Sequence, residues 1–522
     1  MNVQMIMGNV FLAALWLSPS GSMAGDIHSG EKVMPTVVRY EDYGAKGDGK
    51  TDDSEAIAKA HEFANQHRLP VCANDQASYY IGGQDRTAVI ETDTDFGSAT
   101  FLIDDTAVEN VRAPVFHVRS TLASVKPKGI STLKENQSRI DAMFLGACVV
   151  QAKNDKVKHF IRKGGNQNSG SVQTDVFLVD ADGKVADETP IQWDFAVISE
   201  IIAYPVDEKT LTIKGGRFTT IANAGHPGNT YYARGITITR SNVVVEDLEH
   251  RITGEGEKGA PYGGIIVIND CANVTVRNTL VTGHKTYWKP GKLGEPVPMG
   301  SYGISINRSL NITLQNVKQT NDIHDKRYWG IMCSNFCKNL VLDGCSLSRF
   351  DAHQGVYNAT IRNSEIGHMG ILAIGKGTLL VENTTIKTRH FMGFRSDYGS
   401  TWRGDVIIRN SVFAPPNPKD AVIFSGNNTG DHDFGYACTM PERITLDGFR
   451  VDDGKAPAGY QGLAIFGNFN PKFKANEKPQ PYPYTPTKEI ILKHVTTASG
   501  KPLRVSDNAP MLKDVVVMSS TM

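Results

Sequence analysis

Histidines recur at one position of a repeated pattern in the second half of the chain. The chain has only 14 histidines, and five of them stand in the turn just before a glycine-aliphatic pair opens a new repeat, with His250 as a sixth candidate. These five are His284, His324, His353, His368 and His390. Parallel strands stack about 4.7–4.9 Å apart, so histidines at equivalent positions of stacked repeats are expected along one edge. Crowded imidazoles favour the neutral form, and a neutral imidazole is a competent general base.

Other reactive side chains are expected on the same edge. They are Arg327, Tyr328, Asp351, Arg395, Asp397, Tyr398, Trp402 and Arg403. Aromatic rings offer flat faces to sugar rings, and guanidinium groups bind acidic substituents. This composition is typical of a groove that binds an acidic carbohydrate.

β-Elimination of a uronic-acid glycan suits these residue types. The reaction needs a group that neutralises the carboxylate, a base that takes the C5 proton and an acid that protonates the leaving oxygen. We predict His353, His324, His390, Arg395 and Tyr398 as catalytic residues. The predicted substrate-binding residues are His284, Arg327, Tyr328, Asp351, His368, Asp397, Trp402 and Arg403.

Four alternatives to this chemistry remain open. Asp351 and Asp397 would lie about 10 Å apart, two coils along the stack. That separation is only just compatible with an inverting hydrolase. The histidines could instead fill turns or bind a metal, and the protein could bind a glycan without cleaving it. A divalent cation such as Ca²⁺ is compatible with the lyase chemistry, and nothing in the sequence requires one.

The elements that would position these side chains form a repeat. A glycine followed by an aliphatic residue opens a short strand, polar residues turn, and a second strand alternates apolar and polar positions, as in "YGISINRSLNITLQNV". The opening glycines are Gly235, Gly264, Gly303, Gly330, Gly355, Gly370 and Gly393. Such strands cannot pack alone, so they predict a stacked solenoid with an apolar interior. The Asn-x-Ser/Thr triplets at Asn273, Asn311 and Asn383 are interpreted as turns rather than glycosylation acceptors.

The segment "YEDYGAKGDGKTDDSEAI" near the N-terminus resembles the N-terminal motif of the pectate-lyase-like superfamily. The resemblance implies an all-β, right-handed, single-stranded parallel β-helix with a capping α-helix at its N-terminal end. Among members of that superfamily, the alginate and glycosaminoglycan lyases fit the residue types best. We expect Asp52 and Glu55 to form a capping box for that helix, and Ile57, Ala60 and Phe63 to form its inner face.

The predicted organisation has five parts. An apolar run followed by Ser22-x-Ala24 predicts a signal peptide over residues 1–24, and therefore a secreted or periplasmic protein. The cap and first coils are expected at 25–100, an irregular β-rich insertion at 101–230, the central β-helix at 231–450, and C-terminal coils with a Pro-rich loop at 451–522. A turn is expected at Asp182-Gly183 within the insertion.

Amino-acid composition indicates which kinds of binding partner to expect. The chain carries 55 basic and 55 acidic residues, so no excess of positive charge favours nucleic acid, and no run is long enough to span a membrane. The expected partner is an acidic polysaccharide, with the oligomeric state undetermined. The seven cysteines do not form a disulfide framework. We interpret Cys333, Cys337 and Cys345 as small buried residues of stacked strands.

Overall fold

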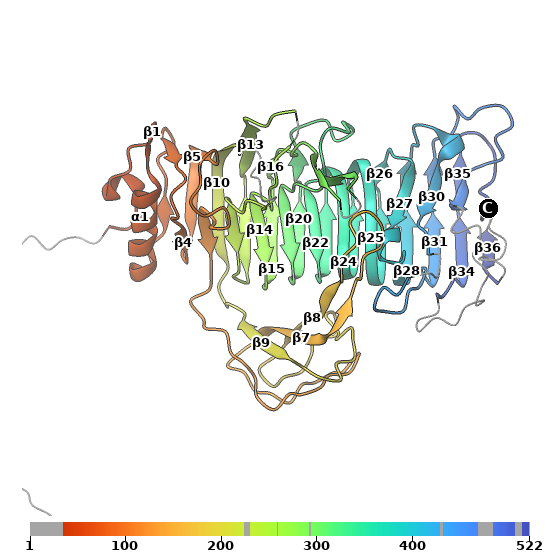
Figure 1. The fold of residues 1–522 in the computed structure, drawn as a ribbon, viewed down its shortest axis with the longest axis horizontal. Helices are drawn as coiled ribbons and strands as arrows, with labels where there is room; N and C mark the ends of the chain where they lie inside the picture. Colours follow the sequence, from red (N-terminus) through yellow and green to blue (C-terminus); the bar gives the residue numbers. More distant parts are fainter. Residues whose placement is uncertain are drawn as a thin grey trace, which may run out of the picture. The chain divides into compact units, whose positions relative to one another are not determined.

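Short parallel strands wind around one apolar interior and form three ladders (Figure 1). The computed structural model describes residues 35–223, 230–257, 259–291, 294–428, 432–467, 484–506 and 514–520. Residues 37–522 form one unit. The predicted signal peptide lies outside the described residues. The unit is a right-handed parallel β-helix with one N-terminal α-helix, which confirms the predicted fold class.

Each ladder is a column of hydrogen-bonded strands, one from each coil. The first ladder contains β2 (Val71–Cys72), β5 (Thr94–Asp104), β10 (Leu211–Ile221), β12 (Val243–Glu246), β15 (Ala272–Arg277), β20 (Leu310–Gln315), β23 (Lys338–Asp343), β28 (Trp402–Arg409), β31 (Arg443–Asp447), β34 (Glu489–Lys493) and β36 (Val516–Ser520). The second contains β1 (Asp48–Asp52), β3 (Ser78–Ile81), β13 (Glu249–Thr253), β16 (Leu280–Val281), β21 (Lys318–Gln319), β26 (Thr385–Ile386), β29 (Val412–Phe413), β32 (Arg450–Val451) and β35 (Thr496–Thr497). The third contains β4 (Ala88–Ile90), β6 (Phe116–Val118), β11 (Ile236–Ile238), β14 (Ile266–Asn269), β19 (Ile304–Asn307), β22 (Met332–Asn335), β27 (His390–Phe394), β30 (Val422–Ser425) and β33 (Ala464–Phe466).

β5 and β10 run through both the first and the second ladder. Two longer strands pass through all three ladders. They are β24 (Ser346–Arg362) and β25 (Glu365–Glu382), and they pair with each other in parallel. β24 pairs successively with β21, β22 and β23. The coil that carries His353 is therefore hydrogen-bonded to neighbouring coils in all three ladders.

The interior is built from residues in register. Ile236, Ile266, Ile304 and Met332 occupy successive coils of the third ladder, and all four are buried. Burial of a large aliphatic side chain contributes about 1.5–3 kcal/mol, so the stack is held mainly by the hydrophobic effect.

Asparagines make many of the corners. Asn273, Asn311 and Asn383 all have positive φ, which an asparagine tolerates better than most residues. Their side chains bond to equivalent asparagines of adjacent coils, as in Asn311 Nδ2 to Asn273 Oδ1 at 3.1 Å. Asn383 lies in the turn between β25 and β26, as predicted, whereas Asn273 and Asn311 are the second residues of β15 and β20.

Helix α1 (Ser54–His67) lies at the N-terminal end of the stack (Figure 1). Ile57 and Ala60 are buried and Phe63 is half-buried. The predicted capping box is wrong. Asp52 accepts the backbone N–H of Ser54 at 3.0 Å, whereas Glu55 pairs with Lys59 at 2.8 Å. The fully buried helix residue His61 bonds to Tyr40 of the short 3₁₀ helix η1 (Tyr40–Tyr43).

A separate antiparallel sheet lies beside the solenoid, and we call it the accessory sheet (Figure 1). It consists of β7 (Cys148–His159), β8 (Ser171–Val179) and β9 (Glu200–Pro205). Gly183 has a φ of 77° in the tight turn that follows β8, where the sequence predicted one. The loop around residues 285–301 is a hairpin of β17 (Tyr287–Pro290) and β18 (Pro296–Met299). The other 3₁₀ helices are η2 (Ser396–Tyr398) and η3 (Pro418–Asp420).

Candidate functional site

His353 continues a row of hydrogen-bonded asparagines, an asparagine ladder, that ends the strands β14, β19 and β22 of the third ladder. Asn335 donates through Nδ2 to Asn307 Oδ1 at 2.7 Å, and Asn307 donates to Asn269 Oδ1 at 3.0 Å. Asn335 therefore turns its Oδ1 toward His353, whose Nδ1 lies 2.7 Å away. An oxygen acceptor at this distance requires a hydrogen on Nδ1. The neutral ring then carries its lone pair on Nε2.

The hydroxyl of Tyr398, in η2, faces that lone pair. It lies 3.3 Å from His353 Nε2 and accepts a bond from Gln354 Nε2 at 3.4 Å. Gln354 in turn accepts a hydrogen bond from Ser171 of the accessory sheet at 3.0 Å. A chain of hydrogen bonds thus runs from the accessory sheet through Tyr398 to His353.

Burial keeps His353 neutral. It lowers the pKa of the imidazole to about 4, because burial and the nearby arginines together outweigh the opposing effect of Asp351. Burial also raises the pKa of Tyr398, against the opposing effect of Arg162 and Arg395. At neutral pH the pair is therefore an uncharged imidazole and an uncharged phenol.

Five charged side chains surround this pair, and we call them the ion cluster. They are Arg162, Arg349, Asp351, Arg395 and Asp397. Arg395 bonds to both carboxylates, with Nη2 2.8 Å from Asp397 and Nη1 3.2 Å from Asp351. Arg162 Nε lies 2.7 Å from the same Asp397 oxygen that Arg395 Nη2 contacts, and Arg349 pairs with Asp351. Three guanidinium groups against two carboxylates leave one excess positive charge.

The arginines decide the ionisation of the two acids. Burial alone would raise the pKa of Asp351, but Arg349 and Arg395 bring it below its usual value. The pKa of Asp397 is lowered in the same way, because Arg395 and Arg162 outweigh burial. Both carboxylates are thus held ionised.

Two cavities adjoin these residues. The first, of about 390 Å³, is lined by His353, Gln354, Asn335, Arg308 and Tyr302 among others, and we call it the His353 cavity. The second, of about 490 Å³, contains Asp397, Arg162 and Trp329, and we call it the Asp397 cavity. Tyr302 and Trp329, one from each cavity, both lie against Gly300. Together the cavities provide room for more than one sugar unit, with aromatic and cationic walls.

The structure brings together five of the thirteen residues predicted for the site: His353, Arg395, Tyr398, Asp351 and Asp397. Three of these carry a correction. Arg395 and Asp397 were expected to line a groove that binds an acidic carbohydrate, but they follow the end of β27 at Phe394 and both side chains are bound within the ion cluster. Asp351 is buried under two arginines rather than open to a substrate.

The other histidines do not form one column along a single edge. His250 and His284 are neighbours, with ring centroids 6.4 Å apart, and His284 is buried, stacked on Tyr262 and bonded to Glu255. His324 lies 3.3 Å from Glu365, and His368 contacts the backbone of Ile323. His390 is half-buried at the start of β27. Burial, more than crowding of charges, lowers the pKa of His250, His368 and His390.

The remaining predicted residues also lie elsewhere. Trp402 is fully buried in the core, where its Nε1 donates to the carbonyl of Gly377, so it cannot contact a glycan. Arg327 is exposed and pairs with Asp325, with its guanidinium over the ring of Tyr328. Arg403 lies at a different cavity, under the accessory sheet.

Several residues of the site were not predicted from the sequence. Asn335 could have been found, because Asn269, Asn307 and Asn335 end equivalent strands of successive coils. Arg162 could not, because it comes from the insertion, 235 residues from its partner Asp397 along the chain.

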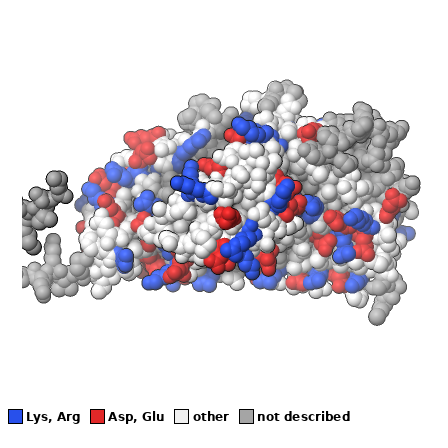
Figure 2. Space-filling view, turned by 90° about the horizontal axis from the view of Figure 1, so that it is seen from below, with Lys and Arg blue, Asp and Glu red and all other residues white. Residues whose placement is uncertain are grey.

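A metal site, a membrane span or a strongly charged binding surface would each require particular features in the part of the chain that the structure describes. No three His, Cys, Asp or Glu side chains gather there as a metal site. No helix among those residues is long and apolar enough to cross a membrane. Figure 2 shows basic and acidic side chains interspersed over the face seen from below, without a large area of one sign.

Comparisons with known proteins support the fold. The chain matches no protein-family profile and no curated protein sequence. Among solved structures, it is similar to the tailspike gp61 of Pseudomonas phage phi297, at 13% identity and a TM-score of 0.56, over 93% of this chain and 84% of the tailspike. It is also similar to the Gp54 tailspike of Acinetobacter baumannii bacteriophage AP22, solved in complex with A. baumannii capsular saccharide. That match has 11% identity and a TM-score of 0.51, over 92% and 79% of the two chains. At these identities the likeness is one of fold.

Proposed function

We propose that this protein binds an acidic polysaccharide in the two adjoining cavities and cleaves it by β-elimination next to a uronic acid. The observation that carries the proposal is the state of His353. It is a neutral imidazole whose Nδ1–H is fixed by Asn335, whose basic Nε2 faces the Tyr398 hydroxyl, and whose ring lines a cavity. A similar fold in a tailspike bound to capsular saccharide is consistent with a glycan as the ligand.

The reaction assigns one role to each group. Nε2 of His353 takes the C5 proton, the C5–H electrons form the C4–C5 double bond, and the C4–O bond breaks. The imidazolium then returns its proton to the leaving oxygen, which restores the neutral ring. One imidazole serves both steps when the C5–H and C4–O bonds lie on the same face of the sugar.

Tyr398 is a partner of His353 in this scheme and does not contact the glycan, because its side chain is buried. Its 3.3 Å contact with Nε2 is long, and the proposal requires it to open so that Nε2 can take the C5 proton. The excess positive charge of the ion cluster favours the uronate carboxylate and its developing negative charge. Arg395 holds Asp351 and Asp397 in place rather than binding substrate.

Hydrolysis is the alternative chemistry, and the acids argue against it. A glycosidase needs one carboxylic acid with a raised pKa to protonate the leaving group. The pKa values of Asp351 and Asp397 are both lowered by their arginine partners. Neither acid would be protonated at neutral pH.

A screen of uronic-acid polysaccharides tests the proposal. The purified protein is incubated with alginate, chondroitin, dermatan and pectate, and unsaturated products are followed by ultraviolet absorbance together with reducing ends. Both signals should rise together. Reducing ends without the absorbance would show hydrolysis, and tight binding of an unchanged oligosaccharide would show a binding protein.

A further inference from the structure

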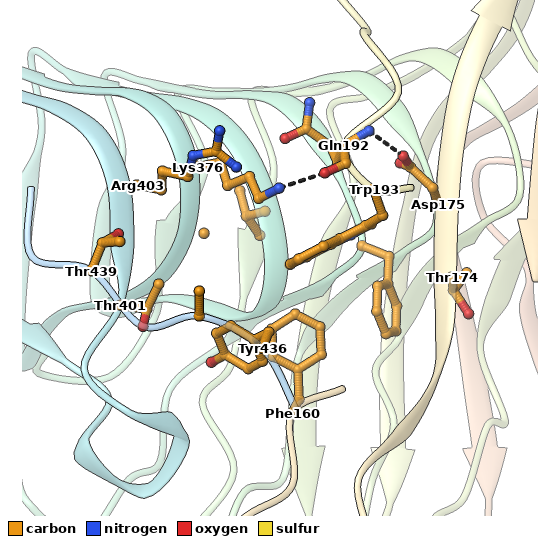
Figure 3. Close-up of a pocket in the computed structure, with 15 residues that line it drawn as sticks. Phe160, Thr174, Asp175, Gln192, Trp193, Lys376, Thr401, Arg403, Tyr436 and Thr439 are labelled. Atoms are coloured by element: carbon orange, nitrogen blue, oxygen red, sulfur yellow. Dashed lines mark hydrogen bonds between the residues drawn. The ribbon is translucent and has the colours of Figure 1, made fainter. Parts of the chain in front are cut away.

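A third cavity lies between the accessory sheet and the solenoid, and Phe336 lines both it and the His353 cavity. Its volume is about 160 Å³. We call it the aromatic cavity, because Phe160, Trp193, Phe336 and Tyr436 form much of its wall (Figure 3). An apolar cavity of about 150 Å³ is large enough to hold one benzene ring.

The wall of the aromatic cavity is mainly apolar but carries two cations on one side. In Figure 3, Lys376 and Arg403 lie above the space, with Phe160 and Tyr436 below it. The Lys376 ammonium donates to the carbonyl of Gln192, lies 3.4 Å from Glu135 and stands 3.7 Å from the centre of the Trp193 ring. Arg403 bonds to the same Glu135 through Nη1 at 2.9 Å. Lys376 and Arg403 share Glu135, while Asp175, which also lines the cavity, is paired with Lys338 at 2.9 Å. Three cations therefore stand against two carboxylates, which leaves one excess positive charge.

Two further observations indicate that the cavity is suited to a ligand. Burial lowers the pKa of Lys376 to about 8, with Arg403 adding to the effect against Glu135 and Asp175, so a further anion beside it would stabilise the ammonium. Thr439 also lines the cavity, and its hydroxyl is buried without a hydrogen-bond partner among the described residues. A buried polar group without a partner costs about 1–3 kcal/mol unless something satisfies it.

We propose that the aromatic cavity is a binding site for a small single-ring carboxylate. The ring would lie among Phe160, Trp193 and Tyr436, where aromatic side chains favour stacked or edge contacts. The carboxylate would lie toward Lys376 and Arg403. The proposal concerns binding alone and holds whether or not the chain cleaves a glycan.

Calorimetric titration of the full-length protein tests this site with three probes of matched size or charge. Benzoate combines the ring and the anion, benzylamine keeps the ring and reverses the charge, and acetate keeps the anion without the ring. Benzoate should bind at least about tenfold more tightly than either of the others, because loss of one charged hydrogen bond or of ring burial costs about that factor. Equal binding of acetate would mean a surface effect of anions, and equal binding of benzylamine would mean a ring site without charge selection. Either result, or no binding of benzoate, overturns the proposal.

Variants locate the binding. Lys376→Met keeps the length of the side chain and removes the charge, and it should weaken benzoate at least about tenfold. Arg403→Gln, at a half-exposed position that the fold tolerates more readily, should weaken it in the same direction. Lys387→Met is the matched control, because Lys387 is a surface lysine paired with Glu365. Unchanged affinity in both Lys376→Met and Arg403→Gln, or an equal loss in Lys387→Met, overturns the assignment.

Discussion

His353 Nδ1 lies 2.7 Å from Asn335 Oδ1, and this contact sets the tautomer of the imidazole. The direction of the asparagine ladder is what matters, since each amide donates to the coil before it and leaves an oxygen for the next. Without the ladder, either ring nitrogen could carry the proton.

The first prediction concerns His353 itself. His353→Gln should lower turnover of the cleaved polysaccharide by about a hundredfold to ten-thousandfold, the usual contribution of a general base. Turnover is measured by ultraviolet absorbance, and the melting temperature shows whether the fold survives. His368→Gln is the control, because His368 lies outside the two cavities and should retain most of the activity. An equal loss of turnover in the two variants would show that His353 is not the general base.

The second prediction concerns Asn335. Asn335→Asp places a carboxylate against Nδ1–H, which stabilises the imidazolium and raises the pKa of His353 above about 4. The base is active only when neutral, so the acid limb of the pH–rate profile should move to higher pH. An unchanged acid limb together with reduced turnover would mean that Asn335 has only a structural role. ¹⁵N NMR of His353 should show the proton on Nδ1 in the wild-type protein.

The third prediction is a loss of stability in mild acid. Burial lowers the pKa of His61 to about 3, of His250 to about 3 and of His159 to about 4, all from an ordinary value of 6.5. Below pH 6.5 the unfolded chain therefore binds more protons than the folded chain, so the free energy of unfolding falls as pH falls toward these values. Urea unfolding at pH 7 and pH 5 should show this decrease. His61→Gln should reduce the difference, and an identical difference in that variant would contradict the assignment to His61.

The fourth prediction concerns the attachment of the accessory sheet. Lys338 of β23 and Asp175 of β8 form a buried ion pair at 2.9 Å. Lys338→Met leaves the carboxylate buried without its cation and should cost about 3–5 kcal/mol of stability. Lys338→Met/Asp175→Asn should recover part of that loss, because the unpaired charge is gone.

The control for this pair is a surface ion pair. Arg443→Met breaks the exposed contact with Glu489 and should change stability by less than about 1 kcal/mol. If Lys338→Met costs no more than Arg443→Met in thermal or urea unfolding, the buried pair does not hold the sheet in place.

The solenoid was predictable because its determinants are local. Period-two alternation turns Ile266 and Ile268 of one coil toward the interior. The equivalent residues of the next coil, Ile304 and Ile306, are buried in the same way. Asparagine and glycine tolerate the left-handed backbone that the corners need. Each repeat carries this information within a few residues, and stacking adds only the hydrophobic interior.

The site was only partly predictable because its determinants are distant in sequence. The sequence by itself singled out His353, Arg395 and Tyr398, whose residue types suit proton transfer and charge. Only the tertiary structure bound Arg162 to Asp397 and Ser171 to Gln354, since the insertion folds back against the solenoid. It also buried Trp402 in the core and left the other predicted histidines outside the two cavities. An alignment of repeats cannot show this, because it does not say how far each turn bulges from the stack.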